Sequence, residues 1–493
     1  MSRFPTFHFI ILLLLCFTSC YKERVVFDAE PNSSLELPLI LKINNKNCSF
    51  DSNSKTLRYP IDNESIESFG CLIEFQDYSN IYFKGSLLEN NTINNLGDIE
   101  VNKDYDLLVI TNNTTRELKL KFTRLPIIQI ITHNEIVDEP KKIARLIINY
   151  PETAENVITS YVGIEFRGET SQSFPKKSMS FSFLNSTFTN DETSKSIFNL
   201  PQNSDWGLDA MYVDKSRLRN KTSFDLWKHI QGDRNHSVHY YFVELYINSE
   251  HQGLYCIHEL VNSEFLNLVD NDAVLYKAID WTGTLFDFYS EDVSSNKHWD
   301  GWEQKFPEDA INWEPLANLR SSVVNDSDFD FSTKIEELIN LDNVIDYYLF
   351  INLISVSDNV GKNNYLTRES DHESLCIIPW DLDGSLGIMW NGDYVSYTNI
   401  LSNNLFDRLI SVNPNGFKYK LKDRWLNLRM KCLSTDKILS TLEFNFNTIY
   451  ESDVQQIENH RWGGDVDFLE EYQYINNWII NRVSFLDDYY MNL

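Results

Sequence analysis

The chain has 493 residues and a formal net charge of −29, with 42% hydrophobic and 14% aromatic residues. Such a composition can bury a substantial core, which excludes a disordered chain, and at roughly 150 residues per domain the length allows two or three domains. The negative charge argues against a nucleic-acid partner, because proteins that bind the phosphate backbone display basic stripes.

Residues 1–20 have the pattern of an export signal. A short apolar run at residues 9–17 is too short to span a bilayer and ends in Thr18, Ser19 and Cys20. Small residues just before a cysteine resemble a bacterial lipoprotein cleavage box, with Cys20 as the lipidated residue. We therefore expect an exported protein with a lipid tether at Cys20 to the cell envelope, in the outer or cytoplasmic membrane or at the surface. A plain secretory signal is the alternative.

Residues 21–125 form the first predicted domain. Runs of alternating apolar and polar residues, such as "GCLIEF", "DYDLLVI" and "ELKLKFTRL", are separated by turns rich in Asn, Ser, Asp and Gly. Several short strands of this kind predict a small all-β, sandwich-like domain. Cys48 and Cys71 in this region could form a disulfide, whereas the other three cysteines of the mature chain, Cys256, Cys376 and Cys432, could equally be buried small apolar residues.

Residues 126–493 form the second predicted domain, which begins with strands. In "YVGIEFRGETSQSFPKKSMSFSFL", two strands flank a polar connection that contains Arg167. Lys177 shares a strand face with Met179, because side chains alternate between the two faces of a strand. We expect Lys177, rather than Lys176, to point into a cleft and hold phosphates, as the strand lysine of protein kinases does. Alternatively, the ammonium group of Lys177 reaches solvent from the end of the apolar stripe.

Further along the chain, strands give way to helices. Asp214 can cap a helix that carries Arg219, and a hairpin pattern that carries Glu244 and Glu259 follows it. From about residue 332 the helical period dominates, interrupted by the stretch "CIIPWDLDGSLG". The predicted fold class is therefore α+β, with a sheet-rich half followed by a helix-rich half.

Three polar residues of the helix-rich half form a candidate catalytic and metal site. Asp358 and Asn363 have the spacing of the catalytic-loop aspartate and the metal-binding asparagine of protein kinases, and Asp381 follows the next apolar strand. In that arrangement the first carboxylate orients the attacking hydroxyl, and the other two side chains hold Mg²⁺ against nucleotide phosphates. Alternatively, Asp381 and Asp383 only stabilise a turn.

Eight motifs occur in an order that carries a family resemblance. They are "FRGETSQSFPKKSMSF", "DWGLDAMYVDKSRLRN", "VELYINSEHQGLYCIHE", "LYKA", "DNVGKNNYL", "PWDLDGSLG", "DRWLNLR" and "HRWGG". Over residues 126–493 the chain resembles the spore coat protein H (CotH) kinase family. The resemblance implies an atypical protein-kinase-like domain with two lobes, which binds ATP with Mg²⁺ and phosphorylates serines or threonines of proteins.

The resemblance also implies roles for individual residues. Lys177 would contact phosphates, Asp358 would act on the acceptor hydroxyl, and Asn363 with Asp381 would hold the metal. The other implied nucleotide contacts, which could instead be structural pairs, are Arg167, Arg219 and Glu259. The register of the metal ligands stays open by a residue or two, since Asn364 and Asp383 lie close by.

Together these observations predict ATP- and Mg²⁺-dependent phosphotransfer to serine or threonine residues of secreted or surface proteins. Two alternatives remain, because a fold does not fix a reaction. One is a surface-anchored binding or scaffold protein with an inactive kinase-like fold. The other is a different nucleotide transfer, such as AMPylation.

Overall fold

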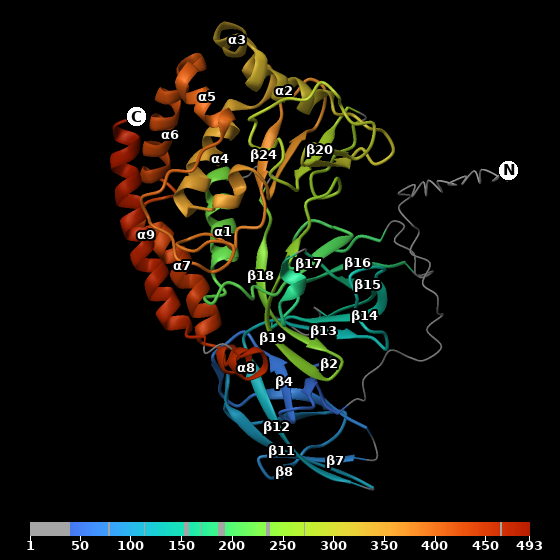
Figure 1. Cartoon of the computed structure of the whole chain (residues 1–493). Helices are drawn as coiled ribbons and strands as arrows, with labels where there is room; N and C mark the ends of the chain where they lie inside the picture. The colour runs from blue at the N-terminus through green and yellow to red at the C-terminus, as the bar shows by residue number, and fades with distance from the viewer. Residues whose placement is uncertain are drawn as a thin grey trace, which may run out of the picture.

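The computed structural model describes residues 40–76, 79–112, 114–151, 157–168, 170–185, 193–232, 237–270, 272–463 and 466–493. The predicted signal peptide and Cys20 lie outside these residues. Figure 1 shows an N-terminal all-β region at one end, a barrel in the middle, and a sheet with helices at the other end. The mixed α and β content agrees with the predicted fold class, whereas the two-lobed kinase-like arrangement stays a prediction.

The regular secondary structure of the N-terminal region, within residues 40–125 as far as they are described, consists of strands. A four-stranded sheet of order β2-β1-β6-β9 and a six-stranded sheet of order β3-β4-β12-β11-β7-β8 bury one shared core. Alternation explains this packing: Tyr105, Leu107 and Val109 of β11 are buried while the residues between them are not. Cys48 and Cys71 are free, buried thiols in this core, so the disulfide that the sequence suggested is not formed. The strands are β1 (Lys42–Ile43), β2 (Lys46–Asn47), β3 (Ser49–Asp51), β4 (Thr56–Pro60), β5 (Ser65–Ile66), β6 (Gly70–Glu74), β7 (Ser79–Phe83), β8 (Ser86–Leu87), β9 (Thr92–Asn95), β10 (Ile99–Glu100), β11 (Asp104–Thr111) and β12 (Thr115–Thr123).

A closed barrel of order β13-β14-β15-β16-β17-β19-β18 follows, and the parallel pairing of β13 with β18 closes it. Apolar side chains from alternate positions fill its interior, including Met179, Phe181 and Phe183 of β16, as the sequence predicts. The strand begins at Met179, so Lys177 precedes it. The barrel strands are β13 (Ile127–Ile131), β14 (Lys142–Asn149), β15 (Val157–Phe166), β16 (Met179–Phe183), β17 (Asp205–Asp209), β18 (Tyr240–Ile247) and β19 (Glu250–Glu259).

The third part is a five-stranded sheet of order β21-β22-β20-β23-β24 with helices packed around it. Helix α4 is apolar on nearly all sides and is buried between the sheet and the other helices. The strands are β20 (Val274–Ala278), β21 (His298–Trp299), β22 (Trp302–Phe306), β23 (Asn364–Arg368) and β24 (Cys376–Pro379). The helices are α1 (Arg219–Gln231), α2 (Glu314–Asn325), α3 (Asp328–Leu338), α4 (Leu341–Ile354), α5 (Asn404–Val412), α6 (Phe417–Met430), α7 (Thr435–Tyr450), α8 (Val454–Trp462) and α9 (Phe468–Met491).

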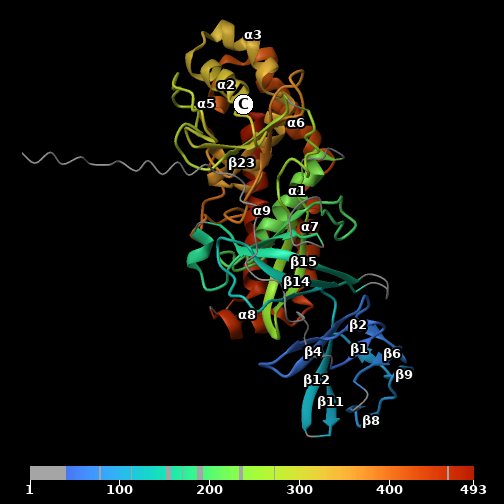
Figure 2. The same ribbon diagram turned by 90° about the vertical axis from the view of Figure 1, so that its right-hand side faces the viewer.

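The N-terminal region is fixed to the rest of the chain near the start of α8 (Figures 1 and 2). Arg58 of β4 donates two hydrogen bonds of 2.7 Å to the carboxylate of Asp453, and Lys121 of β12 donates a third of 2.6 Å. Across the same junction, Arg124 forms an ion pair of 2.8 Å with Glu451. These contacts join residues that are hundreds of positions apart in the sequence.

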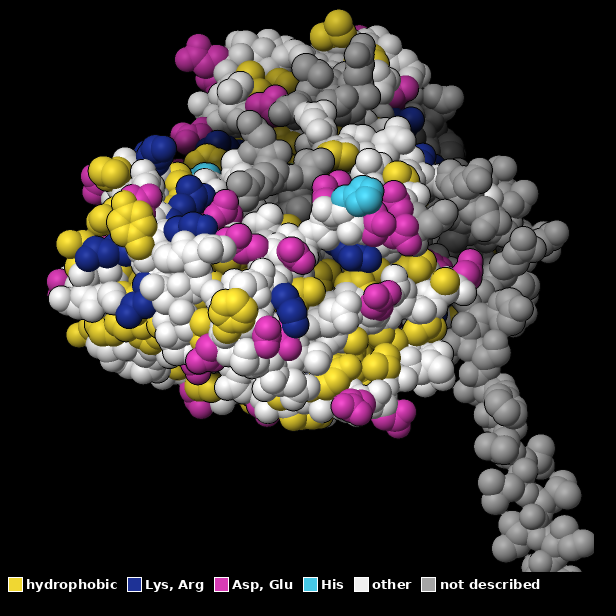
Figure 3. Space-filling view, turned by 90° about the horizontal axis from the view of Figure 1, so that it is seen from above, with side chains coloured by type: hydrophobic (Ala, Val, Ile, Leu, Met, Phe, Trp, Pro, Cys, Tyr) yellow, Lys and Arg dark blue, Asp and Glu magenta, His cyan; other side chains and the backbone are white. Residues whose placement is uncertain are grey.

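No helix in the described part of the chain is both long and apolar enough to cross a membrane. On the face seen in Figure 3, acidic, basic and apolar side chains are interspersed. This mixed surface is the usual pattern of a folded protein in contact with water.

Candidate functional site

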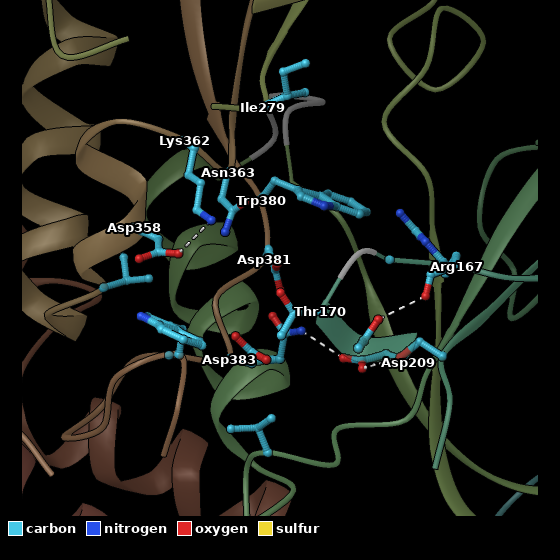
Figure 4. Close-up of a pocket in the computed structure, with 18 of the residues that line it drawn as sticks. Arg167, Thr170, Asp209, Ile279, Asp358, Lys362, Asn363, Trp380, Asp381 and Asp383 are labelled. Carbon is cyan, nitrogen blue, oxygen red and sulfur yellow. Dashed lines mark hydrogen bonds and ion pairs between the residues drawn. The ribbon is translucent and has the colours of Figure 1, made fainter. Parts of the chain in front are cut away.

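A cavity of about 330 Å³ lies where the barrel, α1 and the five-stranded sheet meet. Figure 4 shows charged side chains that converge on it from these separate elements. The charged residues that line it, among those the structure describes, are Arg167 after β15, Asp209 at the end of β17, Lys277 in β20, Asp358 and Lys362 after α4, and Asp381 and Asp383 after β24.

Asp381 and Asp383 form the acidic side of the cavity. Both follow β24, and Asp381 adopts a left-handed backbone conformation with φ of 55°, which is unusual for a residue other than glycine. Such conformations persist where the surrounding structure enforces them, often at functional sites. The turn therefore holds two carboxylates at one cavity wall.

These carboxylates repel one another in a partly enclosed space. Burial, and next the charge of Asp209, raise the pKa of Asp381 to about 6, although Lys277 and Arg167 act in the opposite direction. Burial and the charge of Asp381 likewise raise the pKa of Asp383. Asp381 is nevertheless open to the cavity, so a cation placed there could contact it directly.

A divalent cation would relieve this repulsion, so the residues fit one. The described residues contain no group of three His, Cys, Asp or Glu side chains arranged to hold a metal ion. Mg²⁺ usually keeps several waters and needs only one or two carboxylates together with substrate phosphates. Asp381 and Asp383 supply such a pair.

Arg167 and Lys277 form the basic side of the cavity. The Arg167 guanidinium lies 5.4 Å from the centre of the Trp380 ring, and the Lys277 ammonium lies 5.9 Å from that of Tyr365. Neither has an ion-pair partner among the described residues. Burial and the neighbouring Arg167 charge lower the pKa of Lys277. Two cations held close together without a bound carboxylate can accept an anionic ligand such as a phosphate.

Asp358 lies on the helix-rich side of the cavity, in the short 3₁₀ helix Ser357–Val360. Its carboxylate is 3.6 Å from the Lys362 ammonium. Burial raises the pKa of Asp358, and Lys362 partly offsets this effect. A carboxylate with a raised pKa is a better proton acceptor than an exposed one, which suits a group that activates a hydroxyl.

Asn363 lines the cavity and Asn364 does not. Asn363 has φ of 57°, its N–H donates to Ala278 at 3.1 Å, and its carbonyl accepts from Trp380 at 3.0 Å. Asn364 begins β23 and lines a separate small cavity. Of the two registers that the sequence leaves open, the geometry favours Asn363.

The structure does not bring Lys177 to the cavity. Its ammonium group donates to the backbone carbonyls of Gln172 and Phe174. The alternation that predicts an inward direction does not apply, because Lys177 precedes the first paired residue of β16. The sequence prediction for Lys177 is therefore not supported by its position.

Lys176 is instead fully buried in an ion-pair centre outside the cavity. Its ammonium lies 2.8 Å from Oε1 of Glu458, whose Oε2 lies 2.9 Å from the Arg217 guanidinium. Burial lowers the pKa of Lys176 to about 8, and the two cations hold the pKa of Glu458 below its usual value against the effect of burial. At neutral pH Lys176 and Glu458 are therefore charged, and both cations of the centre have Glu458 as their partner.

Arg219 and Glu259 also lie outside the cavity lining. Arg219 is buried against Asp214 and Glu471, and Glu259 accepts a hydrogen bond of 2.7 Å from the backbone N–H of His239. The sequence leaves open whether these residues contact the nucleotide or form structural pairs, and their contacts agree with structural pairs. Arg167 does line the cavity, as expected for a nucleotide contact.

Sequence reasoning missed Lys277 and Asp209. Lys277 is the one charged residue in the buried strand β20, and an isolated lysine in an apolar run was an available signal. Asp209 ends β17 just as Asp381 follows β24, so a carboxylate at a strand end was a signal there too. Both lie in stretches that carry the family resemblance.

A cavity that joins strand-end carboxylates to cations without an ion-pair partner among the described residues suits a ligand with phosphates and a divalent cation. The family model described as CotH kinase protein matches residues 164–486, and the chain belongs to this family. Among solved structures, the crystal structure of a Helicobacter pylori proinflammatory kinase, CtkA, is similar at 10% identity and a TM-score of 0.32, over 63% of this chain and 96% of that chain. No curated protein matches the chain.

Proposed function

We propose that the protein transfers the terminal phosphoryl group of ATP, with Mg²⁺, to serine or threonine hydroxyls of exported proteins. The observation that supports this most directly is the meeting of Asp358, Asp381 and Lys277 in one cavity from three separate segments of the chain. A protein kept only for binding would not need Asp358, Asn363 and Asp381 together at one cavity.

Each cavity wall has a role in this proposal. Asp381 and Asp383, with Asn363, would hold Mg²⁺, which when bound neutralises charge on the phosphates. Arg167 and Lys277 would bind the phosphate oxygens. Lys277 takes the role that the sequence assigns to Lys177.

Asp358 would act on the acceptor. The acceptor hydroxyl oxygen bonds to the terminal phosphorus, the bond from that phosphorus to the bridging oxygen breaks, and ADP leaves. The hydroxyl proton passes to the Asp358 carboxylate, whose pKa is raised by burial. The ion pair with Lys362 keeps this carboxylate in place.

Export and a lipid at Cys20 complete the proposal and rest on the sequence pattern alone. They place the acceptor among secreted or surface proteins. Labelling cells with a lipid precursor tests this part: the wild type should be marked and Cys20→Ala should not.

The test of the reaction is mass spectrometry of a surface-protein extract incubated with the purified protein, Mg²⁺ and ATP that carries heavy oxygen in its terminal phosphate. We expect heavy phosphate on serine or threonine residues with the wild type and none with Asp381→Asn. AMP adducts would instead show nucleotidyl transfer, and an unmodified extract would contradict the proposal.

A further inference from the structure

The first turn of α1 binds the backbone turn at residues 381–385. The Arg219 Nε donates to the carbonyl of Ser385 at 3.1 Å, and the hydroxyls of Ser223 and Ser385 lie 3.0 Å apart. The Ser385 hydroxyl then donates to the carbonyl of Leu382 at 2.6 Å. Because these side chains are fully buried, α1 fixes the turn that carries the cavity carboxylates.

Asn220, the next residue of α1, extends this contact to the barrel. Its Oδ1 accepts a hydrogen bond of 3.1 Å from the N–H of Leu382, and its Nδ2 donates one of 2.8 Å to Oδ2 of Asp209. The side chain lines the cavity and is only 4% exposed. One amide therefore connects the end of β17 to the strand-end turn.

Only one orientation of the Asn220 amide can form both hydrogen bonds. Leu382 offers a donor and Asp209 offers an acceptor, so a flipped amide would place two donors face to face at Leu382. Asp209 is held from its other oxygen by the N–H of Met211 at 2.9 Å. An aspartate at position 220 would keep the bond from Leu382 but lose the one to Asp209.

One end of the bridge is the backbone N–H of Leu382, next to the two carboxylates that would hold the cation, and the other end is the carboxylate of Asp209. Leu382 lies between Asp381 and Asp383 in the sequence, and Figure 4 shows Asp209 on the opposite side of the same cavity. Partners that hydrogen-bond to ligating groups set the position of those groups, and their loss weakens metal binding.

We propose that Asn220 is a positioning residue of the divalent-cation site, whose amide holds Asp209 and the turn at residues 381–383 in a fixed relation before the cation binds. This inference rests on the Mg²⁺ site of the proposed function. It assigns to α1 a part in cation binding, in addition to the parts proposed for Asn363, Asp381 and Asp383.

The test is calorimetric titration of the full chain with Mn²⁺ alone, which takes the same oxygen ligands as Mg²⁺. Asn220→Asp should bind Mn²⁺ roughly 10-fold to 100-fold more weakly than the wild type, the usual effect of removing such a partner. Asp209→Asn breaks the same hydrogen bond from the barrel side and should also weaken binding. The double variant Asn220→Asp/Asp209→Asn re-forms the bond with its direction reversed at unchanged net charge, so it should recover most of the affinity.

Asp205→Asn is the matched control, since Asp205 begins the same strand and does not line the cavity. Thermal melts identify folded variants, and Asp209→Asn answers the question if Asn220→Asp does not fold. Wild-type affinity in a folded Asn220→Asp protein, or a double variant no better than Asn220→Asp, would overturn the inference alone. A wild type that binds no Mn²⁺ would overturn the cation site of the proposed function and this inference with it.

Discussion

Two clusters of charge in the molecule contain similar residues but differ in how they are paired. Around Glu458, the cations of Lys176 and Arg217 are buried, and both carboxylate oxygens are occupied. In the cavity, Arg167 and Lys277 have no ion-pair partner among the described residues. Loss of one member of a fully paired buried cluster destabilises the fold, whereas a charge beside a cavity without an ion-pair partner is available to a ligand.

The largest expected effect is on the cavity. Asp381→Asn keeps the size of the side chain but removes a charge and a hard oxygen from the cation site. We expect phosphotransfer to fall by roughly a thousandfold or more, because positioning and electrostatics around the metal supply most of the catalysis. The thermal midpoint should not fall, since a repelling carboxylate is removed. Phosphate transfer from labelled ATP and a thermal melt measure the two effects. Undiminished transfer in a folded variant would mean that Asp381 only stabilises the turn.

The Glu458 cluster should respond in the opposite way. Glu458→Gln leaves Lys176 and Arg217 buried without a counter-charge, which should lower the free energy of unfolding by about 3 to 5 kcal/mol. Chemical denaturation measures this loss. A matched change at the exposed pair, Glu100→Gln, should alter stability far less, because its partner Lys103 is largely solvated. Equal effects at the two sites would contradict the structural role of the buried centre.

Two lysines allow the same comparison within one residue type: Lys277 lines the cavity and Lys177 does not. Lys277→Met should lower phosphotransfer by about a hundredfold, as expected for the loss of one cation that contacts the transferred group. Lys177→Met should leave it within about twofold, because the ammonium group of Lys177 is bound to the backbone carbonyls of Gln172 and Phe174 and Lys177 itself does not line the cavity. Steady-state kinetics of both variants show which of the two lysines contributes to phosphotransfer. The reverse order of effects would restore the sequence-based assignment of Lys177.

The smallest effect concerns the junction at Asp453, where pairing is complete but partly exposed. Burial acts to raise the pKa of Asp453, but Arg58 and Lys121 lower it well below 3.8. This carboxylate therefore adds stability above its unfolded pKa and loses it as the pH falls through the folded value. Relative to Asp453→Asn, the wild type should be more stable by about 1 to 3 kcal/mol at neutral pH. The difference should shrink below about pH 4. Urea unfolding across this range measures it, and a pH-independent difference would contradict the ion pairs.

Much of the fold could be predicted from local patterns. Alternation identified strands such as β11 and β12, and the apolar helical run identified α4, because both patterns depend only on neighbouring residues. Closure of the barrel through β13 and β18 could not be predicted, since that pairing joins residues more than one hundred positions apart.

In the site, too, local patterns could be predicted and contacts between distant residues could not. Asp358, Asn363 and Asp381 were predicted by spacing and do lie at one cavity, while their catalytic and metal roles stay predictions. Lys177 was assigned from a strand register that begins two residues later in the structure. Arg219 and Glu259 lie in motifs of the family resemblance, which made them candidates for nucleotide contacts. Only the fold shows that Arg219 is paired with Asp214 and Glu471 and that Glu259 is bound to His239.

The closed barrel has a practical consequence for work with shortened chains. The family match begins at residue 164, which lies inside β15, so a fragment with that boundary would lack β13 and β14. Only residues 164–166 of β15 would remain, and they and β18 would become open sheet edges with unpaired backbone groups. Such edges recruit strands from other molecules, so this fragment should aggregate even though it retains the residues that line the cavity.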